Sequence, residues 1–276
     1  MRRARVADTD LQFEFRGAGQ PVLLIHGTVL ADSFWPLAQE PAIVNNHLVI
    51  RYHRRGFGGS SRISMPWSIE QHAMDAARLL QQLGVRRAHI VGHSTGAAVA
   101  VQLALDFPEM VGSLTLLELA LSSAAAAASV SKQFSHSAAI YDSGNKAGAL
   151  DLLLQVFGGP DYRSLVDAFL PPGVFDVAVH DADTIFLYEL PALAVWTLTQ
   201  NIIMRLSGPV LLATGVKTLP IYSESQQLLA EWLPEAETVV FSEVGHALHM
   251  QAPDAIAEFL QGFFRRNPFS TSADAS

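Results

Sequence analysis

The chain has no cysteine, a low content of charged residues and no long uninterrupted apolar segment. The absence of cysteine excludes disulfide bridges and cysteine-based metal sites. No stretch of about eighteen uncharged apolar residues occurs, so the sequence predicts no transmembrane span. Charged residues make up only 16% of the chain, and the net charge is −8. This negative charge argues against nucleic acid or an anionic membrane surface as the main partner.

The chain does have enough apolar material for a large folded core. Hydrophobic residues account for 50% of its 276 residues, which excludes a disordered chain, and this length allows one or two domains. The basic start Met1–Arg5 resembles that of a signal peptide, but Val6–Asp10 is not the apolar segment that would follow. We therefore expect a soluble cytoplasmic protein, while no feature of the sequence indicates its oligomeric state.

Short apolar segments alternate with segments of helical periodicity along most of the chain. This alternation predicts βαβ units with a mostly parallel sheet, and therefore an α/β protein. The expected strands are Leu11–Phe15, Val22–Ile25, Leu48–Tyr52, Ala88–Val91, Leu114–Leu117, Val210–Ala213 and Thr238–Phe241. The expected helices include Ile69–Leu83, Ala97–Phe107, Ser223–Trp232 and Pro253–Phe264.

The alternation stops between about residues 119 and 206. This segment is helical in character and is broken at Gly158-Gly159-Pro160 and at Pro171-Pro172-Gly173. We interpret it as a helical cap inserted after the sixth strand, over the sheet edge where ligands bind in open α/β proteins. A second domain of unrelated function is the alternative. The predicted organisation is a core of residues 1–118 and 207–266, a cap of residues 119–206 and a flexible tail of residues 267–276.

The segment Gly92-His93-Ser94-Thr95-Gly96 lies between an expected strand and an expected helix. A serine between two glycines at such a junction is typical of a nucleophile elbow, in which a sharp turn exposes the hydroxyl. The glycines remove Cβ atoms where strand and helix pack closely, and the helix N-terminus offers free N–H groups to a developing oxyanion. The alternative is a tight turn whose serine only caps the helix.

A serine hydroxyl needs a base and donors for the oxyanion. Among ten histidines, His246 is the best candidate base, because it follows the last expected strand and can lean over the elbow. We expect His249, three residues further on, to pack or cap instead. Thr28 follows His26-Gly27 at the end of another strand, so its backbone N–H and that of Thr95 are the expected oxyanion hole.

Together these motifs resemble those of the α/β-hydrolase family. They are His26-Gly27 followed by Thr28, R-G-x-G-x-S at Arg55–Ser60, G-x-S-x-G at Gly92–Gly96, and G-H-x-x-H at Gly245–His249. The resemblance implies an eight-stranded, mostly parallel sheet with a helical cap and a Ser–acid–His triad. It also implies hydrolysis of an ester, lactone, amide or related bond. Haloalkane dehalogenases and epoxide hydrolases of this fold carry aspartate as the nucleophile, so Ser94 argues against both activities.

The acid of the triad departs from the common family pattern. Many relatives place an aspartate three residues after a glycine at the strand end that corresponds to Gly215, where this chain has Thr218. We favour Glu118, which ends an apolar strand and requires a partner there, because burying a lone carboxylate is costly. Such a relocated acid resembles the Ser–His–Glu triad of certain macrolide-lactone hydrolases. A dyad without an acid, a Glu118 paired to the cap, or a charge supplied by Glu224 are the alternatives.

The cap is rich in aliphatic and aromatic side chains, which predicts an apolar pocket. We expect Trp35, Tyr188 and Trp196 to contact the substrate. His53 replaces an aspartate common in relatives, which puts the ion pair of that loop in doubt. The polar cap residues are expected at the surface or at a hinge: His180, Asp181, Asp183 and Glu189.

The predicted activity is cleavage of a carboxylic ester or lactone of a fairly apolar small molecule. Ser94 attacks the carbonyl, His246 moves the proton and Glu118 orients His246, with an acyl-enzyme intermediate and without a cofactor or metal. A serine-dependent C–C hydrolase, lyase or acyltransferase on the same fold is one alternative. A slow-turnover sensor of a hydrophobic ligand is another, and turnover of simple esters discriminates the two classes.

Overall fold

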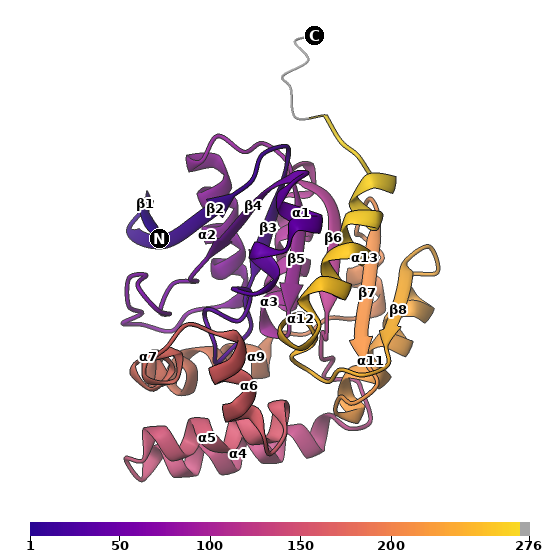
Figure 1. Ribbon diagram of the computed structural model, residues 1–276. Helices are drawn as coiled ribbons and strands as arrows, with labels where there is room; N and C mark the ends of the chain where they lie inside the picture. The colour runs from indigo at the N-terminus through magenta and orange to yellow at the C-terminus, as the bar shows by residue number, and fades with distance from the viewer. Residues whose placement is uncertain (271–276) are drawn as a thin grey trace.

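Eight strands form one sheet in the computed structural model, which describes residues 1–270 (Figure 1). Their spatial order is β1-β2-β4-β3-β5-β6-β7-β8. Both pairings of β2, with β1 and β4, are antiparallel and all other pairings are parallel, which confirms the predicted fold class. The strands are β1 (Arg2–Val6), β2 (Thr9–Arg16), β3 (Gln20–Ile25), β4 (His47–Tyr52), β5 (Ala88–His93), β6 (Val111–Leu117), β7 (Val210–Gly215) and β8 (Glu237–Phe241).

Helices cover both faces of this sheet. On one face lie α2 (Ile69–Gln82), α3 (Thr95–Asp106) and α11 (Pro220–Trp232), and on the other lie α1 (Pro41–Val44) and α13 (Pro253–Arg266). Shorter helices are η1 (Leu37–Gln39), η2 (Pro108–Met110) and α12 (Leu248–Gln251).

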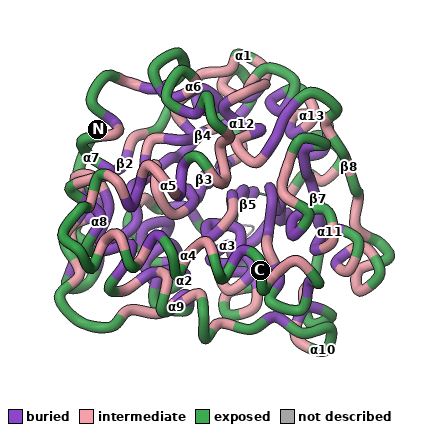
Figure 2. The backbone as a smooth tube through the Cα atoms, turned by 90° about the horizontal axis from the view of Figure 1, so that it is seen from below, coloured by how far each residue is buried: buried purple, intermediate pink, exposed green. Residues whose placement is uncertain are grey.

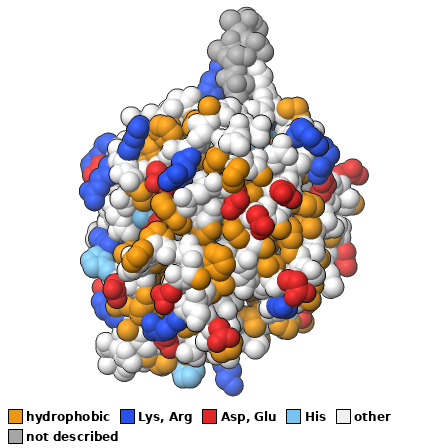
Figure 3. Space-filling view, in the orientation of Figure 1, with side chains coloured by type: hydrophobic (Ala, Val, Ile, Leu, Met, Phe, Trp, Pro, Cys, Tyr) orange, Lys and Arg blue, Asp and Glu red, His pale blue; other side chains and the backbone are white. Residues whose placement is uncertain are grey.

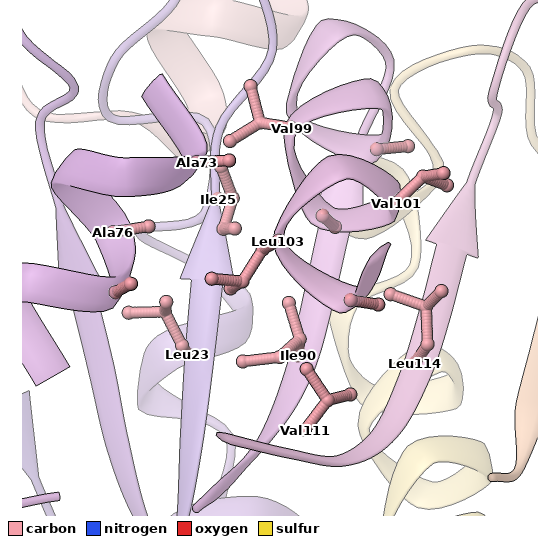
Figure 4. Close-up of a cluster of buried hydrophobic side chains, with 14 of the residues drawn as sticks. Leu23, Ile25, Ala73, Ala76, Ile90, Val99, Val101, Leu103, Val111 and Leu114 are labelled. Carbon is pink, nitrogen blue, oxygen red and sulfur yellow. The ribbon is translucent and has the colours of Figure 1, made fainter. Parts of the chain in front are cut away.

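The apolar core lies between the sheet and its helices, and buried residues gather along the central strands (Figure 2). Figure 4 shows how side chains of α2 and α3 meet those of β3, β5 and β6. Burial of this continuous apolar surface is what holds the central strands, and therefore their carboxyl ends, in a fixed arrangement. On the face seen in Figure 3, acidic and basic side chains are interspersed with hydrophobic ones.

The cap is the chain between β6 and β7, and it lies below the carboxyl ends of the parallel strands in Figure 1. The two predicted interruptions between cap helices are confirmed, because α5 ends at Gly158 and α7 starts after Gly173. The cap elements are α4 (Ala127–Asp142), α5 (Lys146–Gly158), α6 (Tyr162–Phe169), α7 (Val174–His180), α8 (Ala182–Thr184), the π-helical turn η3 (Ile185–Glu189), α9 (Leu190–Val195) and α10 (Gln200–Ile203).

The two ends of the chain differ from expectation. The arginine-rich segment Arg2–Val6 forms β1, with Ala4 and Val6 alternating onto the core. The predicted flexible tail begins with packed residues, because the ring of Phe269 lies 4.7 Å from that of His89. The Phe269 carbonyl also accepts a hydrogen bond from Gln20, while residues 271–276 of the predicted tail lie outside the described part of the chain. No helix within residues 1–270 is both long and apolar enough to cross a bilayer.

Candidate active site

Ser94 lies in a strained turn between β5 and α3. Its φ of 54° is in the left-handed region, and only Ala7 and Glu118 share a positive φ among the described non-glycine residues. A Cβ atom at Gly92 would collide with the carbonyl oxygen of Gly96, so the close packing of strand and helix requires glycine. The Ser94 side chain makes no capping hydrogen bond to α3. The turn therefore presents the hydroxyl rather than using it as a helix cap.

Glu118 lies directly after β6 and its side chain is fully buried. Its Oε2 atom is 3.2 Å from Nδ1 of His246, and its Oε1 atom accepts a 2.7 Å hydrogen bond from the Gly215 N–H. Thr218 donates its hydroxyl proton to Oε2. Thr218, which stands at the usual aspartate position, thus contacts the Glu118 carboxylate. Within residues 1–270, no lysine or arginine forms an ion pair with Glu118.

Glu224, the alternative source of negative charge, faces a different part of the molecule. Its carboxylate accepts a 2.8 Å hydrogen bond from the backbone N–H of Ala126, which precedes α4. Glu224 therefore binds the start of a cap helix, where an anion complements the helix dipole.

Tyr222, on the first turn of α11, lies against the ring face of His246. Its hydroxyl oxygen lies 3.3 Å from Nε2 of His246, and the two rings stack with centroids 4.2 Å apart. Burial, together with the nearby charge of Glu118, raises the pKa of Tyr222, so the phenol stays protonated.

The predicted oxyanion-hole residues lie side by side. The Thr28 and Thr95 hydroxyls share a 2.6 Å hydrogen bond, and both residues border the same cavity as Ser94. Thr95 is the first residue of α3, where backbone N–H groups have no partner within the helix. Both residues are thus placed to offer N–H groups at the sheet edge beside Ser94.

Two further histidines, His93 and His249, pack beside the loop that carries His246. Nε2 of His93 is 2.8 Å from the backbone carbonyl of His246 and donates to it. The ring of His249 packs between those of Phe34 and His93, at 4.5 and 4.2 Å. Burial lowers the pKa of His249 to about 3 and that of His93 well below its usual range, so both rings are neutral. His249 packs in the core, as the sequence predicts.

A cavity of about 690 Å³ opens above Ser94 and His246, between the sheet edge and the cap. Apolar side chains of α4, α5, α6 and α9 form much of its wall, and among residues 1–270 no Asp, Glu, Lys or Arg lines it. Trp196 belongs to this wall, and its indole N–H donates to Gln102 at 3.1 Å. Trp35 and Tyr188 are not among the lining residues. Trp35 instead packs under the Arg51 guanidinium, 4.8 Å from its ring, so two of the three expected substrate contacts lie elsewhere.

Comparison with known proteins identifies the family. A model of the alpha/beta hydrolase family matches residues 22–259. The chain belongs to the α/β-hydrolase family. It is 30% identical to a putative carbamate hydrolase, RutD, of Azorhizobium caulinodans, over 94% of this chain and 97% of that protein.

Two solved structures share the fold of this hydrolase closely. One is a thermophilic esterase from Thermogutta terrifontis, with a TM-score of 0.82 and 20% identity over 96% of this chain and 99% of that one. The other is the enol-lactonase from Burkholderia xenovorans LB400, with a TM-score of 0.82 and 21% identity over 96% of this chain and 100% of that one. At this level of identity the likeness establishes the fold alone.

The hydrolase also contains a buried ion pair that the sequence analysis missed. Arg54 donates to both carboxylate oxygens of Glu189, at 2.5 and 3.1 Å, and to the carbonyls of His26 and Gly27. Glu189 was expected at the surface or at a hinge, but its side chain is only 1% exposed. The Glu189 side chain points inward because the cap segment around η3 contacts the loop after β4, which carries Arg54.

Asp181 is likewise buried rather than superficial. It accepts a 2.7 Å hydrogen bond from the Gly58 N–H and pairs with Arg62. His180 and Asp183 are exposed, in agreement with the expectation. His53, where relatives commonly carry aspartate, lies with its Nε2 atom 3.1 Å from the Asp32 carboxylate.

Neither Tyr222 nor the Arg54–Glu189 pair belongs to a short motif. The only signal in the sequence for Tyr222 is its place four residues after Thr218, at the start of a helix that follows the strand end. Within the described residues, no group of three or more His, Asp or Glu side chains is arranged to hold a metal ion.

Proposed function

We propose that this hydrolase cleaves a carboxylic ester or lactone of an uncharged, bulky and mainly apolar small molecule. The observation that carries the proposal is the contact between buried Glu118 and His246 beside a serine held in a strained turn. A serine, a histidine and a buried carboxylate at the closed end of a cavity are the groups that acyl transfer requires.

The reaction begins when Oγ of Ser94 attacks the carbonyl carbon of the substrate. His246 accepts the serine proton, and Glu118 stabilises the resulting imidazolium through Nδ1. The backbone N–H groups of Thr28 and Thr95 bind the oxyanion. His246 then returns the proton to the leaving alcohol, and water releases the acyl group from Ser94 by the same steps in reverse.

The cavity wall supports the choice of an uncharged substrate. A carboxylate or ammonium placed among these side chains would lose its hydration without gaining a paired charge, which is costly. A volume of about 690 Å³ also accommodates more than a small acyl group. The relatives named as a carbamate hydrolase, an esterase and an enol-lactonase all carry names of enzymes acting on acyl bonds, which supports this reaction class.

Labelling with a fluorophosphonate, followed by an ester and lactone screen, tests the proposal. We expect wild type to be labelled at Ser94 and to hydrolyse a neutral p-nitrophenyl ester faster than its counterpart with a terminal carboxylate. Ser94→Ala should abolish labelling and lower kcat by roughly 10⁶ without unfolding the protein. Ester turnover by Ser94→Ala within about tenfold of wild type contradicts the proposal.

The rival activities give other outcomes in the same assays. A labelled Ser94 with ester turnover only in the presence of an acceptor alcohol indicates an acyltransferase. A labelled Ser94 that turns over no ester or lactone, but binds a hydrophobic ligand, indicates a sensor. Cleavage of a carbon–carbon bond adjacent to a carbonyl indicates a C–C hydrolase.

A further inference from the structure

The buried side chain of Arg54, in the loop after β4, divides its hydrogen bonds between the cap and the core. Toward the cap, it contacts both carboxylate oxygens of Glu189. Toward the core, its Nε and Nη2 atoms donate to the carbonyls of His26 and Gly27, at 3.1 and 2.9 Å. The same guanidinium therefore compensates the Glu189 charge and anchors the backbone that precedes Thr28.

His26 supplies a second donor to the Gly27 carbonyl. Its Nε2 atom accepts a 2.9 Å hydrogen bond from the backbone N–H of Arg54, so the neutral ring carries its proton on Nδ1. Burial, followed by the charge of Arg54, lowers the pKa of His26 and keeps the ring neutral. Nδ1 lies 2.7 Å from the Gly27 carbonyl oxygen and donates to it. This oxygen thus accepts two hydrogen bonds, one of them from a charged group.

These contacts determine the direction of the Thr28 N–H. The Gly27 carbonyl and the Thr28 N–H belong to one planar trans peptide unit, in which they point in opposite directions. The carbonyl points toward Arg54, so the N–H points away from it. Both residues border the cavity, and a Cβ atom on Gly27 would lie 3.2 Å from that of Ser94. Among residues 1–270 no acceptor binds the Thr28 N–H, which leaves this donor free beside the serine.

We propose that Arg54 is a positioning residue that aims the Thr28 N–H at the oxyanion by holding the Gly27 carbonyl. This role deepens the proposed function and rests on it. As Oγ of Ser94 bonds to the substrate carbonyl carbon, the serine proton passes to His246 and the carbonyl electron pair moves onto its oxygen. A fixed N–H stabilises this oxyanion without any rearrangement of the backbone. Hydrogen bonds to the Gly27 oxygen also polarise its peptide unit, which makes the Thr28 N–H a stronger donor.

The competing role for Arg54 is to join the cap to the core through Glu189 and nothing more. In that case the activity of each variant should follow its stability. A positioning role predicts that activity and stability separate, because charge compensation and the bonds to the backbone carbonyls can be removed independently.

The double variant Arg54→Met with Glu189→Leu separates the two roles. It leaves no buried charge without a partner, but the Gly27 carbonyl loses its Arg54 donor. The matched control is Arg55→Met with Asp75→Leu. This control removes a neighbouring buried pair of the same kind and leaves both hydrogen bonds to the Gly27 carbonyl in place.

The readouts are kcat and KM for a neutral p-nitrophenyl ester. We expect the Arg54 double variant to lose about 10- to 10²-fold in kcat with little change in KM, because the oxyanion forms only as the reaction proceeds. The control should stay within about threefold of wild type. Glu189→Gln, which keeps both Arg54 donors on the backbone, should be less stable than the double variant and yet have the higher kcat. Near wild-type kcat in the folded double variant, a loss confined to KM, or an equal loss in the control overturns the positioning role.

Arg54→Lys covers the case in which the double variant fails to fold. It keeps a positive charge beside Glu189 but replaces the planar fork by one ammonium group, which cannot reproduce the contacts with the carboxylate and with both carbonyls. We expect the same loss in kcat at unchanged KM, and a wild-type kcat overturns the positioning role. Absence of fluorophosphonate labelling at Ser94 in wild type would instead reject the proposed function itself.

Discussion

Two buried glutamates lie near the junction of sheet and cap, and their surroundings differ in one respect. Glu189 is held by Arg54, whose guanidinium contacts both carboxylate oxygens. Glu118 is held by a backbone N–H, a threonine hydroxyl and His246. The first carboxylate has a permanent counter-charge, whereas the second contacts no lysine or arginine within residues 1–270.

This difference separates structural from catalytic use of a buried charge. The Arg54 guanidinium already compensates the Glu189 charge, and this ion pair joins the cap to the core. The compensated charge therefore has little electrostatic effect on a reaction elsewhere. In the proposed mechanism, the charge of Glu118 gains its full partner only when His246 becomes an imidazolium. Its interaction is therefore stronger in the transition state than in the ground state, which is the condition for accelerating a reaction.

The largest expected effect is on the activity of Glu118→Gln. By analogy with other triads, replacing the acid by its amide should lower kcat by roughly 10⁴, because the imidazolium loses its counter-charge and the ring its orientation. Kinetics with a p-nitrophenyl ester measure the loss of activity, and a thermal unfolding curve measures the change in stability. A variant with near wild-type kcat would favour a dyad. Glu224→Gln is the control and should be almost neutral.

Glu189→Gln should show the reverse pattern, with a large loss of stability. Removing one partner of a buried pair leaves the Arg54 charge uncompensated and costs about 3–5 kcal/mol of unfolding free energy. Denaturant unfolding measures this loss, and Ser94 labelling of the folded fraction should persist. The double change Arg54→Met with Glu189→Leu should restore most of the stability, since it removes both charges. An unchanged stability of Glu189→Gln would contradict the structural role.

A smaller effect on activity is expected when an aspartate is introduced at position 218, where many relatives carry one. Thr218→Asp should partly rescue Glu118→Gln, because the side chain at position 218 already reaches the carboxylate that faces His246. In the wild-type background the same change should reduce activity, since two carboxylates would then repel each other beside one imidazole. Comparison of kcat for the three variants checks this prediction. If the double mutant shows no recovery while folded, the position 218 loop cannot serve His246.

The smallest effect concerns pH and the histidine beside Glu189. Nε2 of His72 lies 3.9 Å from Glu189, and burial, followed by the charges of Arg54 and Arg55, holds its pKa well below the usual range. The unfolded chain binds a proton here below about pH 6.5 and the folded chain does not. Stability is therefore fully present above that pH and is lost on acidification, by up to about 1.4 kcal/mol per pH unit for one group.

Urea unfolding at several pH values between 7 and 5 measures this loss. His26 and His93 are buried with lowered pKa values as well, so the wild-type slope should exceed that of one group. His72→Phe should flatten the slope by one proton, whereas the exposed control His136→Gln should leave it unchanged. A slope in His72→Phe equal to that of wild type would show that His72 is protonated in the folded protein.

The sequence carried strong local signals for the sheet and for the elbow. Apolar periodicity identifies seven strands, and the glycines at positions 92 and 96 mark the close approach that the structure contains. β1 escaped notice because its arginines obscure the alternation of Ala4 and Val6. The assignments of Trp35 and Tyr188 to the pocket failed for a different reason, since aromatic character does not say which way a side chain faces.

Local features are what the sequence alone determined: the tight serine turn after β5, the histidine after β8, and a carboxylate at the end of an apolar strand. These features can be recognised from the sequence because each depends on neighbours within a few residues. Tertiary structure decided which distant groups meet. Glu118 and His246 are 128 residues apart and Arg54 and Glu189 are 135 apart, and no periodicity encodes such contacts. They arise because parallel strands bring their carboxyl ends to one edge, and because the cap must satisfy every charge that it buries there.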